Sequence, residues 1–262
     1  MSLENYINEK KKEKNILIMT HQILGYPSFE TNEKAIELFY ENGVDLIELQ
    51  IPFSEPVADG PIFMNANQIA VNSGIKVEEC LAFVEKMISK YPKVPFLIMT
   101  YFNIVFKYGL DDFVKKCKQI GVRGLIIPDA PIDDAQDFFE ICMNNDIDLI
   151  GLTTAYTEDK RLIEIAKKSA GFIYYVPRKG VTGRKTVFDD EVINKIRFVK
   201  ALSEKCIAVG FGIADREDII RLVGVSDIAI IGSKVLKIIE EEGLDALNTF
   251  LKDIREGCNN DV

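Results

Sequence analysis

Short β-branched runs alternate with amphipathic stretches along the whole chain, and this alternation limits the possible folds more than any other feature. A β-branched run followed by a helix-like stretch is one βα unit, and repeated βα units build a parallel sheet covered by helices. The runs number eight, at residues 16–20, 46–51, 96–101, 125–128, 149–153, 172–176, 207–209 and 228–231. We therefore expect eight parallel strands.

Each run is followed by a stretch with helical spacing of apolar residues, for example at 31–42, 110–120, 133–144 and 189–203. Gly43 and Gly121 follow two of these stretches, where glycine commonly ends a helix. With 262 residues, 47% of them apolar, the chain can bury one sizeable core. Eight units in this length favour a (β/α)8 TIM barrel, of class α/β, over an open sheet. No linker divides the chain, so we predict a single domain over residues 1–262.

A further helix-like stretch, residues 3–14, precedes the first strand. As an extra N-terminal helix it would cap the bottom of the barrel. Its charged run from Lys10 to Glu13 instead favours a solvated flap.

Composition excludes several classes of function. The formal net charge of -9 opposes binding to nucleic acid or to an anionic membrane surface, and no apolar run approaches the roughly 18 residues of a membrane span. The five cysteines lack CxxC spacing and no signal peptide is visible, which indicates reduced thiols and a cytoplasmic protein. Because His21 is the only histidine, a multi-histidine metal site is impossible and carboxylates become the expected acid/base groups.

Glu48 is the first catalytic candidate. Alternation in residues 46–51 sends Ile47, Leu49 and Ile51 to one face, and this purely apolar face must meet the helices. Glu48 then points into the barrel, where burial would raise its pKa toward a value useful for proton transfer. A glutamate paired inside the barrel for packing alone is the competing interpretation.

Two long connections follow strand candidates. Residues 52–76 are rich in Pro, Gly and Asn, and long loops at the C-terminal ends of barrel strands carry catalytic groups. Asp59 lies in this connection, although Asp-Gly alone is also a common turn. Residues 178–188 have the composition of a mobile lid, and an ordinary flexible loop explains that composition equally well.

A phosphate site is predicted at the last two strand ends, where barrels of this kind often bind phosphate. Gly210-Phe211-Gly212 would let backbone N–H groups approach an anion, and Gly232-Ser233 precedes a helix whose N-terminal dipole favours negative charge. Each signal alone also fits a tight turn. Their positions at two neighbouring strand ends favour phosphate.

The segment from Glu48 to Pro61, ELQIPFSEPVADGP, closely resembles the ELGIPFSDPLADGP signature of the tryptophan synthase alpha subunit. The resemblance continues, in the same order, through MTYFN at 99–103, IPDAP at 127–131, GVTG at 180–183, GFGI at 210–213 and GS at 232–233. It implies a (β/α)8 barrel and a carbon-carbon lyase. The implied reaction is the retro-aldol cleavage of indole-3-glycerol phosphate to indole and glyceraldehyde 3-phosphate, a step of tryptophan biosynthesis.

The resemblance also implies roles for individual residues. Glu48 would be the general acid/base that protonates the indole ring carbon, Asp59 would stabilise charge at the indole N–H, and Tyr174 would support Glu48. Alternation agrees for Tyr174, which shares a face with Phe172 and Val176. The implied substrate-binding residues are Tyr101, Asp129 and Thr182 in the pocket, with Gly183, Phe211, Gly212, Gly232 and Ser233 around the phosphate.

The resemblance further implies a partner. A pyridoxal-phosphate beta subunit would receive the indole in a linear αββα complex, and this chain itself would need no cofactor. The implied interface residues are Pro52, Glu55, Pro56, Asn103, Phe106 and Pro131.

The sequence departs from the signature at a few positions. Gln50 replaces a glycine on the face of Glu48, and Glu55 replaces an aspartate in the loop that would sense the beta subunit. His21 stands where an aromatic residue is usual, and filling that space is favoured over a role in the pocket. Three alternatives remain open: a stand-alone indole-3-glycerol phosphate lyase, a non-catalytic regulatory subunit, and a different phosphosugar-converting barrel.

Overall fold

The computed structural model describes residues 2–130, 136–177, 188–210 and 212–258. The strands are β1 Leu17–Ile23, β2 Leu46–Gln50, β3 Phe96–Met99, β4 Gly124–Ile126, β5 Asp148–Thr154, β6 Ile173–Val176, β7 Ile207–Gly210 and β8 Ile228–Ile231. The helices are α1 Leu3–Lys10, α2 Phe29–Glu41, α3 Pro61–Asn72, α4 Val77–Lys90, α5 Phe102–Tyr108, α6 Leu110–Ile120, α7 Gln136–Asn144, α8 Asp159–Lys168, α9 Asp190–Ser203, α10 Arg216–Leu222, α11 Ser233–Glu241 and α12 Leu244–Glu256.

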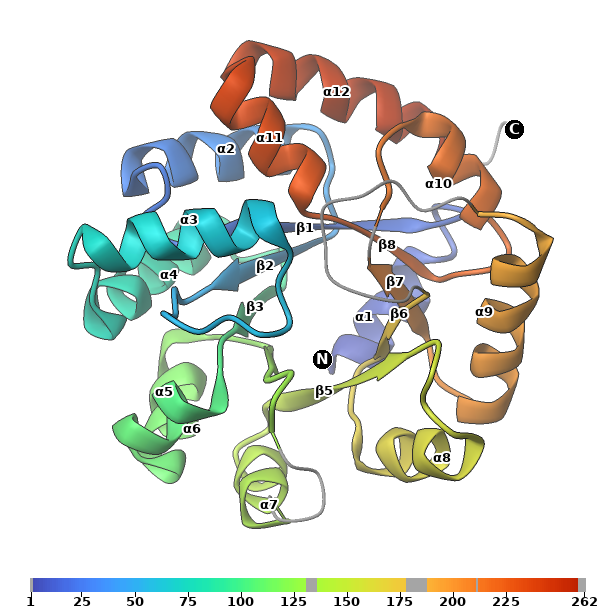
Figure 1. Cartoon of the computed structure of the whole chain (residues 1–262), viewed down its shortest axis with the longest axis horizontal. Coiled ribbons are helices and arrows are strands. Elements are labelled where there is room, and N and C mark those ends of the chain that lie inside the picture. The colour runs from blue at the N-terminus through green and yellow to red at the C-terminus, as the bar shows by residue number, and fades with distance from the viewer. Residues whose placement is uncertain (1, 131–135, 178–187, 211, 259–262) are drawn as a thin grey trace.

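The strands form a closed parallel barrel in chain order, because each pairs with the next and β8 pairs with β1. The helices that follow the strands surround this barrel (Figure 1). The predicted (β/α)8 fold is therefore confirmed. Its register places Glu48 of β2 between His21 of β1 and Leu97 of β3.

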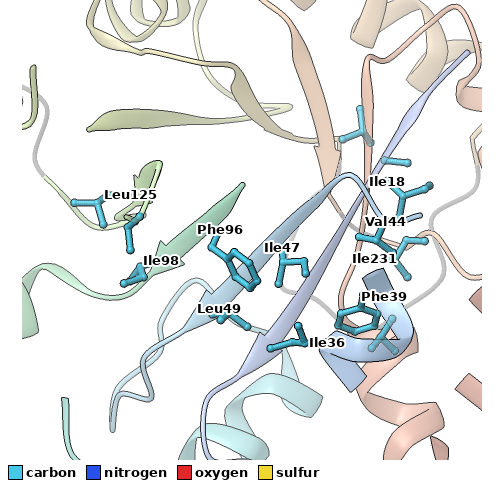
Figure 2. Close-up of a cluster of buried hydrophobic side chains, with 14 of the residues drawn as sticks. Ile18, Ile36, Phe39, Val44, Ile47, Leu49, Phe96, Ile98, Leu125 and Ile231 are labelled. Carbon is cyan, nitrogen blue, oxygen red and sulfur yellow. The ribbon is translucent and has the colours of Figure 1, made fainter. Parts of the chain in front are cut away.

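The two faces of β2 divide as alternation predicts. Ile47 and Leu49 belong to the large apolar cluster between strands and helices, in which Ile36 and Phe39 of α2 also lie (Figure 2). Leu46 belongs instead to the cluster that fills the barrel interior. Since Glu48 has the same parity as Leu46, its side chain points into the barrel.

Helix α1 closes the bottom of the barrel, so the expectation of a solvated flap is wrong. Leu3 and Ile7 are 2% and 0% exposed and pack among the interior side chains. The Leu3 amide donates to Asp148 Oδ2 at 3.0 Å. After the helix, Lys11 pairs with Asp227 and Lys14 Nζ lies 2.7 Å from Asp45 Oδ1. Lys11 and Lys14 thus hold the apolar plug, formed by Leu3 and Ile7 of α1, against the bottom of the barrel.

Nearly half of the predicted long connection at 52–76 is helix rather than loop. Helix α3 occupies Pro61–Asn72, and its buried residues Phe63, Ala66 and Ala70 have helical spacing. Proline fits the first helical position because the N–H that it lacks has no partner there in any case. The predicted helix stops at Gly43 and Gly121 are confirmed, with φ of 69° and 91°.

Candidate active site

Glu48 lies inside the barrel and is 1% exposed. Its Oε1 is 3.7 Å from His21 Nδ1, and its Oε2 has no hydrogen-bond partner among the described residues. Burial, followed by the nearby Asp59 carboxylate, raises the pKa of Glu48 well above its usual value. Glu48 therefore holds a proton under conditions where an exposed glutamate would have lost it.

Asp59 is brought over the barrel by the short turn that precedes α3, in which its amide donates to the Pro56 carbonyl at 2.9 Å. Asp59 Oδ2 accepts hydrogen bonds from Gln50 Nε2 at 2.8 Å and from Asn67 Nδ2 at 3.2 Å. Burial raises the pKa of Asp59 to about 6, against the opposing effect of hydrogen bonds from Gln50, Tyr101 and Asn67. Asp59 is thus mostly ionised at neutral pH.

Tyr174 on β6 faces both carboxylates from across the barrel. Burial, then the charges of Glu48 and Asp59, raise the pKa of its hydroxyl, which keeps the hydroxyl protonated and able to donate. Gly210 of β7 leaves room for its ring, because a Cβ at that position would stand 2.6 Å from Oη and 2.7 Å from Cζ. Neighbouring strands therefore fix the position of Tyr174.

Tyr101 lines the same region from the end of β3. Its hydroxyl accepts a hydrogen bond from the Ala58 amide at 3.1 Å, and its ring stacks on Phe53 with centroids 5.1 Å apart. These contacts fasten the Asp59 turn to the barrel. Asp129, predicted to bind substrate, has one oxygen on the Phe102 amide at 2.8 Å, where it satisfies the first N–H group of α5.

The predicted phosphate residues lie partly in the described chain. Gly212 follows β7 with φ of 80°, a conformation that favours glycine. Gly232 and Ser233 stand at the start of α11, and a Cβ on Gly232 would approach Phe63 to 2.8 Å. The other predicted positions lie outside the described residues, namely Thr182, Gly183 and Phe211, as does most of the predicted lid at 178–188.

Among the predicted interface residues, Glu55, Asn103 and Phe106 are exposed, and Phe106 is 68% exposed. Pro52 and Pro56 are buried, so in this chain they shape the loop rather than offer surface. Pro131 lies outside the described residues. The neighbouring Val57, on the same loop, is 73% exposed.

Two further residues of the site were missed by sequence reasoning. Asn67 on α3 donates to Asp59 and accepts from the Phe53 amide at 3.0 Å, so it joins helix, loop and carboxylate. Phe63 stacks on His21 with centroids 4.4 Å apart. The helical spacing of Phe63 and Asn67 after Pro61 is the signal that would have placed both on one helix face.

His21 lies in the pocket between Phe63 and Glu48. Its ring stacks on Phe63, and its Nδ1 lies near the catalytic candidate Glu48. Burial lowers its pKa to about 3, so the imidazole is neutral, while the Gln50 side chain acts in the opposite direction.

Within the described ranges, no group of three or more His, Cys, Asp or Glu residues has the geometry of a metal site. The five cysteines are free thiols. None of the helices in the same ranges is long and apolar enough to cross a membrane.

Comparison with known proteins gives a consistent family. The family model described as "Tryptophan synthase alpha chain" matches residues 7–260. The tryptophan synthase alpha chain of Desulforapulum autotrophicum is 41% identical over 96% of this chain and 99% of its own length. That of Desulfotalea psychrophila is 42% identical over 97% of this chain and 100% of its own length.

Solved structures agree. A tryptophan synthase structure from Mycobacterium tuberculosis has a TM-score of 0.88 and 29% identity, with 98% of both chains covered. The tryptophan synthase α2β2 complex from Pyrococcus furiosus has a TM-score of 0.84 and 27% identity, with 92% of this chain and 98% of that chain covered.

Proposed function

This chain belongs to the tryptophan synthase alpha chain family, and from that premise we propose that Glu48 and Asp59 carry out the family's reaction. The reaction cleaves indole-3-glycerol phosphate to indole and glyceraldehyde 3-phosphate. The observation that carries the proposal is the placement of two buried carboxylates with different surroundings inside one barrel mouth.

The different surroundings divide the chemical work. To break the bond between the ring carbon and the side chain, the ring carbon must gain a proton while the adjacent side-chain hydroxyl loses one and becomes a carbonyl. Glu48, whose pKa is raised, holds the proton that the ring carbon needs. The electrons of the broken bond return to the ring, and the proton lost by the hydroxyl restores Glu48.

Asp59 supports the same step as a carboxylate. Protonating the ring carbon places positive charge on the indole nitrogen, and a carboxylate that accepts a hydrogen bond from its N–H stabilises that charge. Gln50 and Asn67 both donate to Oδ2, and Tyr101 also donates to this carboxylate, so Asp59 is held in place by three side chains. Pairs of carboxyl groups with separated pKa values commonly divide acid and carboxylate roles in this way.

Gly212, Gly232 and Ser233 would bind the phosphate. The start of α11 offers backbone N–H groups to an anion. This arrangement would supply the local attraction that an acidic chain of net charge -9 otherwise lacks for a phosphorylated substrate.

The chain works with a tryptophan synthase beta subunit, as members of this family do. We propose that the exposed residues Glu55, Asn103 and Phe106 contact that subunit. We also propose that pyridoxal phosphate belongs to the beta subunit and that this chain uses no cofactor. A cytoplasmic location is proposed too, with the free thiols in its support.

The test is indole release from indole-3-glycerol phosphate by the purified chain, alone and with its cognate beta subunit. Glu48→Gln is expected to abolish release, because the amide N–H is far too weakly acidic to transfer a proton to the ring carbon. Asp59→Asn is expected to reduce kcat by about 10²-fold or more, since it removes one electrostatic contact to the transition state. Binding of the product glyceraldehyde 3-phosphate provides a control for an intact pocket.

Three outcomes separate the alternatives. Slow release that the beta subunit strongly accelerates supports the proposal. Fast release without a partner indicates a stand-alone lyase. A folded chain that stimulates the beta subunit but releases no indole under either condition contradicts the catalytic roles and indicates a regulatory subunit.

A further inference from the structure

Gln50 connects the two halves of the active site. It lies on β2 two residues after Glu48, on the same inward face, and is 0% exposed. Its Nε2 donates to Asp59 Oδ2 at 2.8 Å and lies 3.4 Å from Asn67 Oδ1. The family signature has glycine here, so this chain has added a side chain that reaches the second carboxylate.

The chemistry of the partners fixes which way the amide points. An ionised carboxylate only accepts hydrogen bonds, so the NH₂ end of Gln50 must face Asp59 and its carbonyl end must face away. Gln50 Oε1 and His21 Nε2 are both buried and have no partner among the described residues. The Gln50 side chain is also near enough to raise the pKa of the His21 imidazole. The two unpartnered atoms therefore belong to neighbouring side chains.

The other imidazole nitrogen faces Glu48, with Nδ1 at 3.7 Å from Oε1. The imidazole is neutral, so one nitrogen donates and the other accepts. If the proton of Glu48 faces Nδ1, that nitrogen is the acceptor and the imidazole proton lies on Nε2, the nitrogen suited to the Gln50 carbonyl. The donor groups then all point one way. His21 Nε2–H points toward the Gln50 carbonyl, and the Gln50 NH₂ group donates to the Asp59 carboxylate.

We propose that Gln50 is a positioning residue that holds Asp59 as a carboxylate, and that His21 keeps the Gln50 amide turned toward it. This inference rests on the proposed function, since it concerns the same two carboxylates. The arrangement assigns a protonation state to each carboxyl group: the proton stays on Glu48 and the negative charge on Asp59.

Other titratable groups also face Asp59 and must be considered. Glu48 reaches it from β2, Tyr101 from the end of β3 and Tyr174 from β6. The charge of Asp59 disfavours ionisation of Glu48, whereas hydrogen bonds from Gln50, Tyr101 and Asn67 favour the charged form of Asp59. Gln50 makes the shorter of the two side-chain hydrogen bonds to Oδ2 and is the contact that can be removed without changing the Asp59 turn.

The test measures the titration of Asp59 directly, by NMR of the full chain labelled with ¹³C at aspartate carboxyl carbons. The Asp59 signal is identified by its loss in Asp59→Asn. Gln50→Leu removes the donor at nearly constant volume. The matched control is Gln22→Leu on β1, because Gln22 is equally buried and pairs with Leu49, on the face of the sheet opposite Glu48 and Gln50.

In the unaltered chain the signal is expected to titrate near pH 6. Gln50→Leu should move that midpoint upward by about one pH unit, because a hydrogen bond to the charged form is lost. His21→Phe should move it in the same direction by less, since a freed amide can turn its carbonyl toward Asp59. Gln22→Leu should leave it in place. At pH 6 the ionised fraction would fall from about a half to about a tenth in Gln50→Leu.

An Asp59 midpoint that does not move in Gln50→Leu overturns the inference, and so does an equal movement in Gln22→Leu. Gln50→Gly provides a second variant should the leucine disturb folding, which amide NMR spectra would reveal. The acidic limb of kcat/KM against pH should follow the same shift. A chain that shows the titration shift but releases no indole refutes the proposed function and leaves the role of Gln50 in place.

Discussion

Gly210→Ala tests how tightly neighbouring strands hold Tyr174. The added Cβ would stand 2.6 Å from Tyr174 Oη and 2.7 Å from Cζ, closer than real Cβ atoms approach their neighbours. Since both residues lie inside the barrel, the ring must move. Overpacking of this kind costs about 1–3 kcal/mol of unfolding free energy. In a chain of this size that corresponds to a Tm lower by about 2–12 °C.

The displaced ring also changes the chemistry. Tyr174 faces Glu48 and Asp59, and a displacement of about 1 Å near reacting groups can lower the rate by roughly 10²-fold. We therefore expect Gly210→Ala to lose most of its kcat for indole release while the chain remains folded at 25 °C. Thermal unfolding followed by circular dichroism, beside the indole assay, measures both effects.

A second substitution separates this explanation from general damage to β7. Leucine at position 174 ends short of the ring atoms in conflict, so Tyr174→Leu should remove the clash. Gly210→Ala should then cost little further stability in that background, a coupling of opposite sign to the single effects. Two destabilisations that simply add would refute the reasoning.

Three other predictions concern stability. Asp59 has a folded pKa of about 6, above its ordinary value of 3.8, so its ionisation opposes folding as pH rises from about 4 through 6. Asp59→Asn should therefore stabilise the chain at pH 7.5, by on the order of 2 kcal/mol, and by much less at pH 4.5, as urea unfolding at both values would show. Ile7→Ala, at a position 0% exposed beneath the barrel, should cost about 2–5 kcal/mol and leave kcat within about twofold; a larger loss of kcat would show that α1 also shapes the site. Lys14→Met should cost about 2–4 kcal/mol because it leaves buried Asp45 unpaired, whereas Lys12→Met, at an exposed pair, should cause no measurable change in Tm; equal losses would contradict the distinction.

The direction of Glu48 could be predicted from sequence because it depends on one local rule. On a parallel strand with an apolar face, alternation decides which side chains meet the helices, and Ile47 and Leu49 leave no choice for β2. The number of strands followed from the same kind of pattern. The direction of Glu48 and the number of strands both depend on patterns of consecutive residues, and tertiary contacts did not override these patterns.

The contacts among side chains were beyond such reasoning. The bond from Gln50 to Asp59 depends on how the turn before α3 folds back over the mouth, and no local rule gives that path. The stacking of Phe63 on His21 joins α3 to β1, so it depends on packing between distant segments.

The misjudged N-terminal segment shows a different limit. Its run of charges suggested exposure, yet Lys11 in the run and Lys14 just after it pair with carboxylates of the barrel bottom. Composition gives the number of charges but does not show where their partners lie.

Helix α1 closes the lower end of the barrel in the part of the chain that the structure describes. Leu3 and Ile7 seal the lower end, and interior side chains fill the space above them. If Glu48 acts as proposed, indole formed beside it would leave by the upper rim, the same end by which the substrate would enter. A partner protein bound at that end would control both the entry of substrate and the release of indole. It would also take up the indole before the indole reaches bulk water.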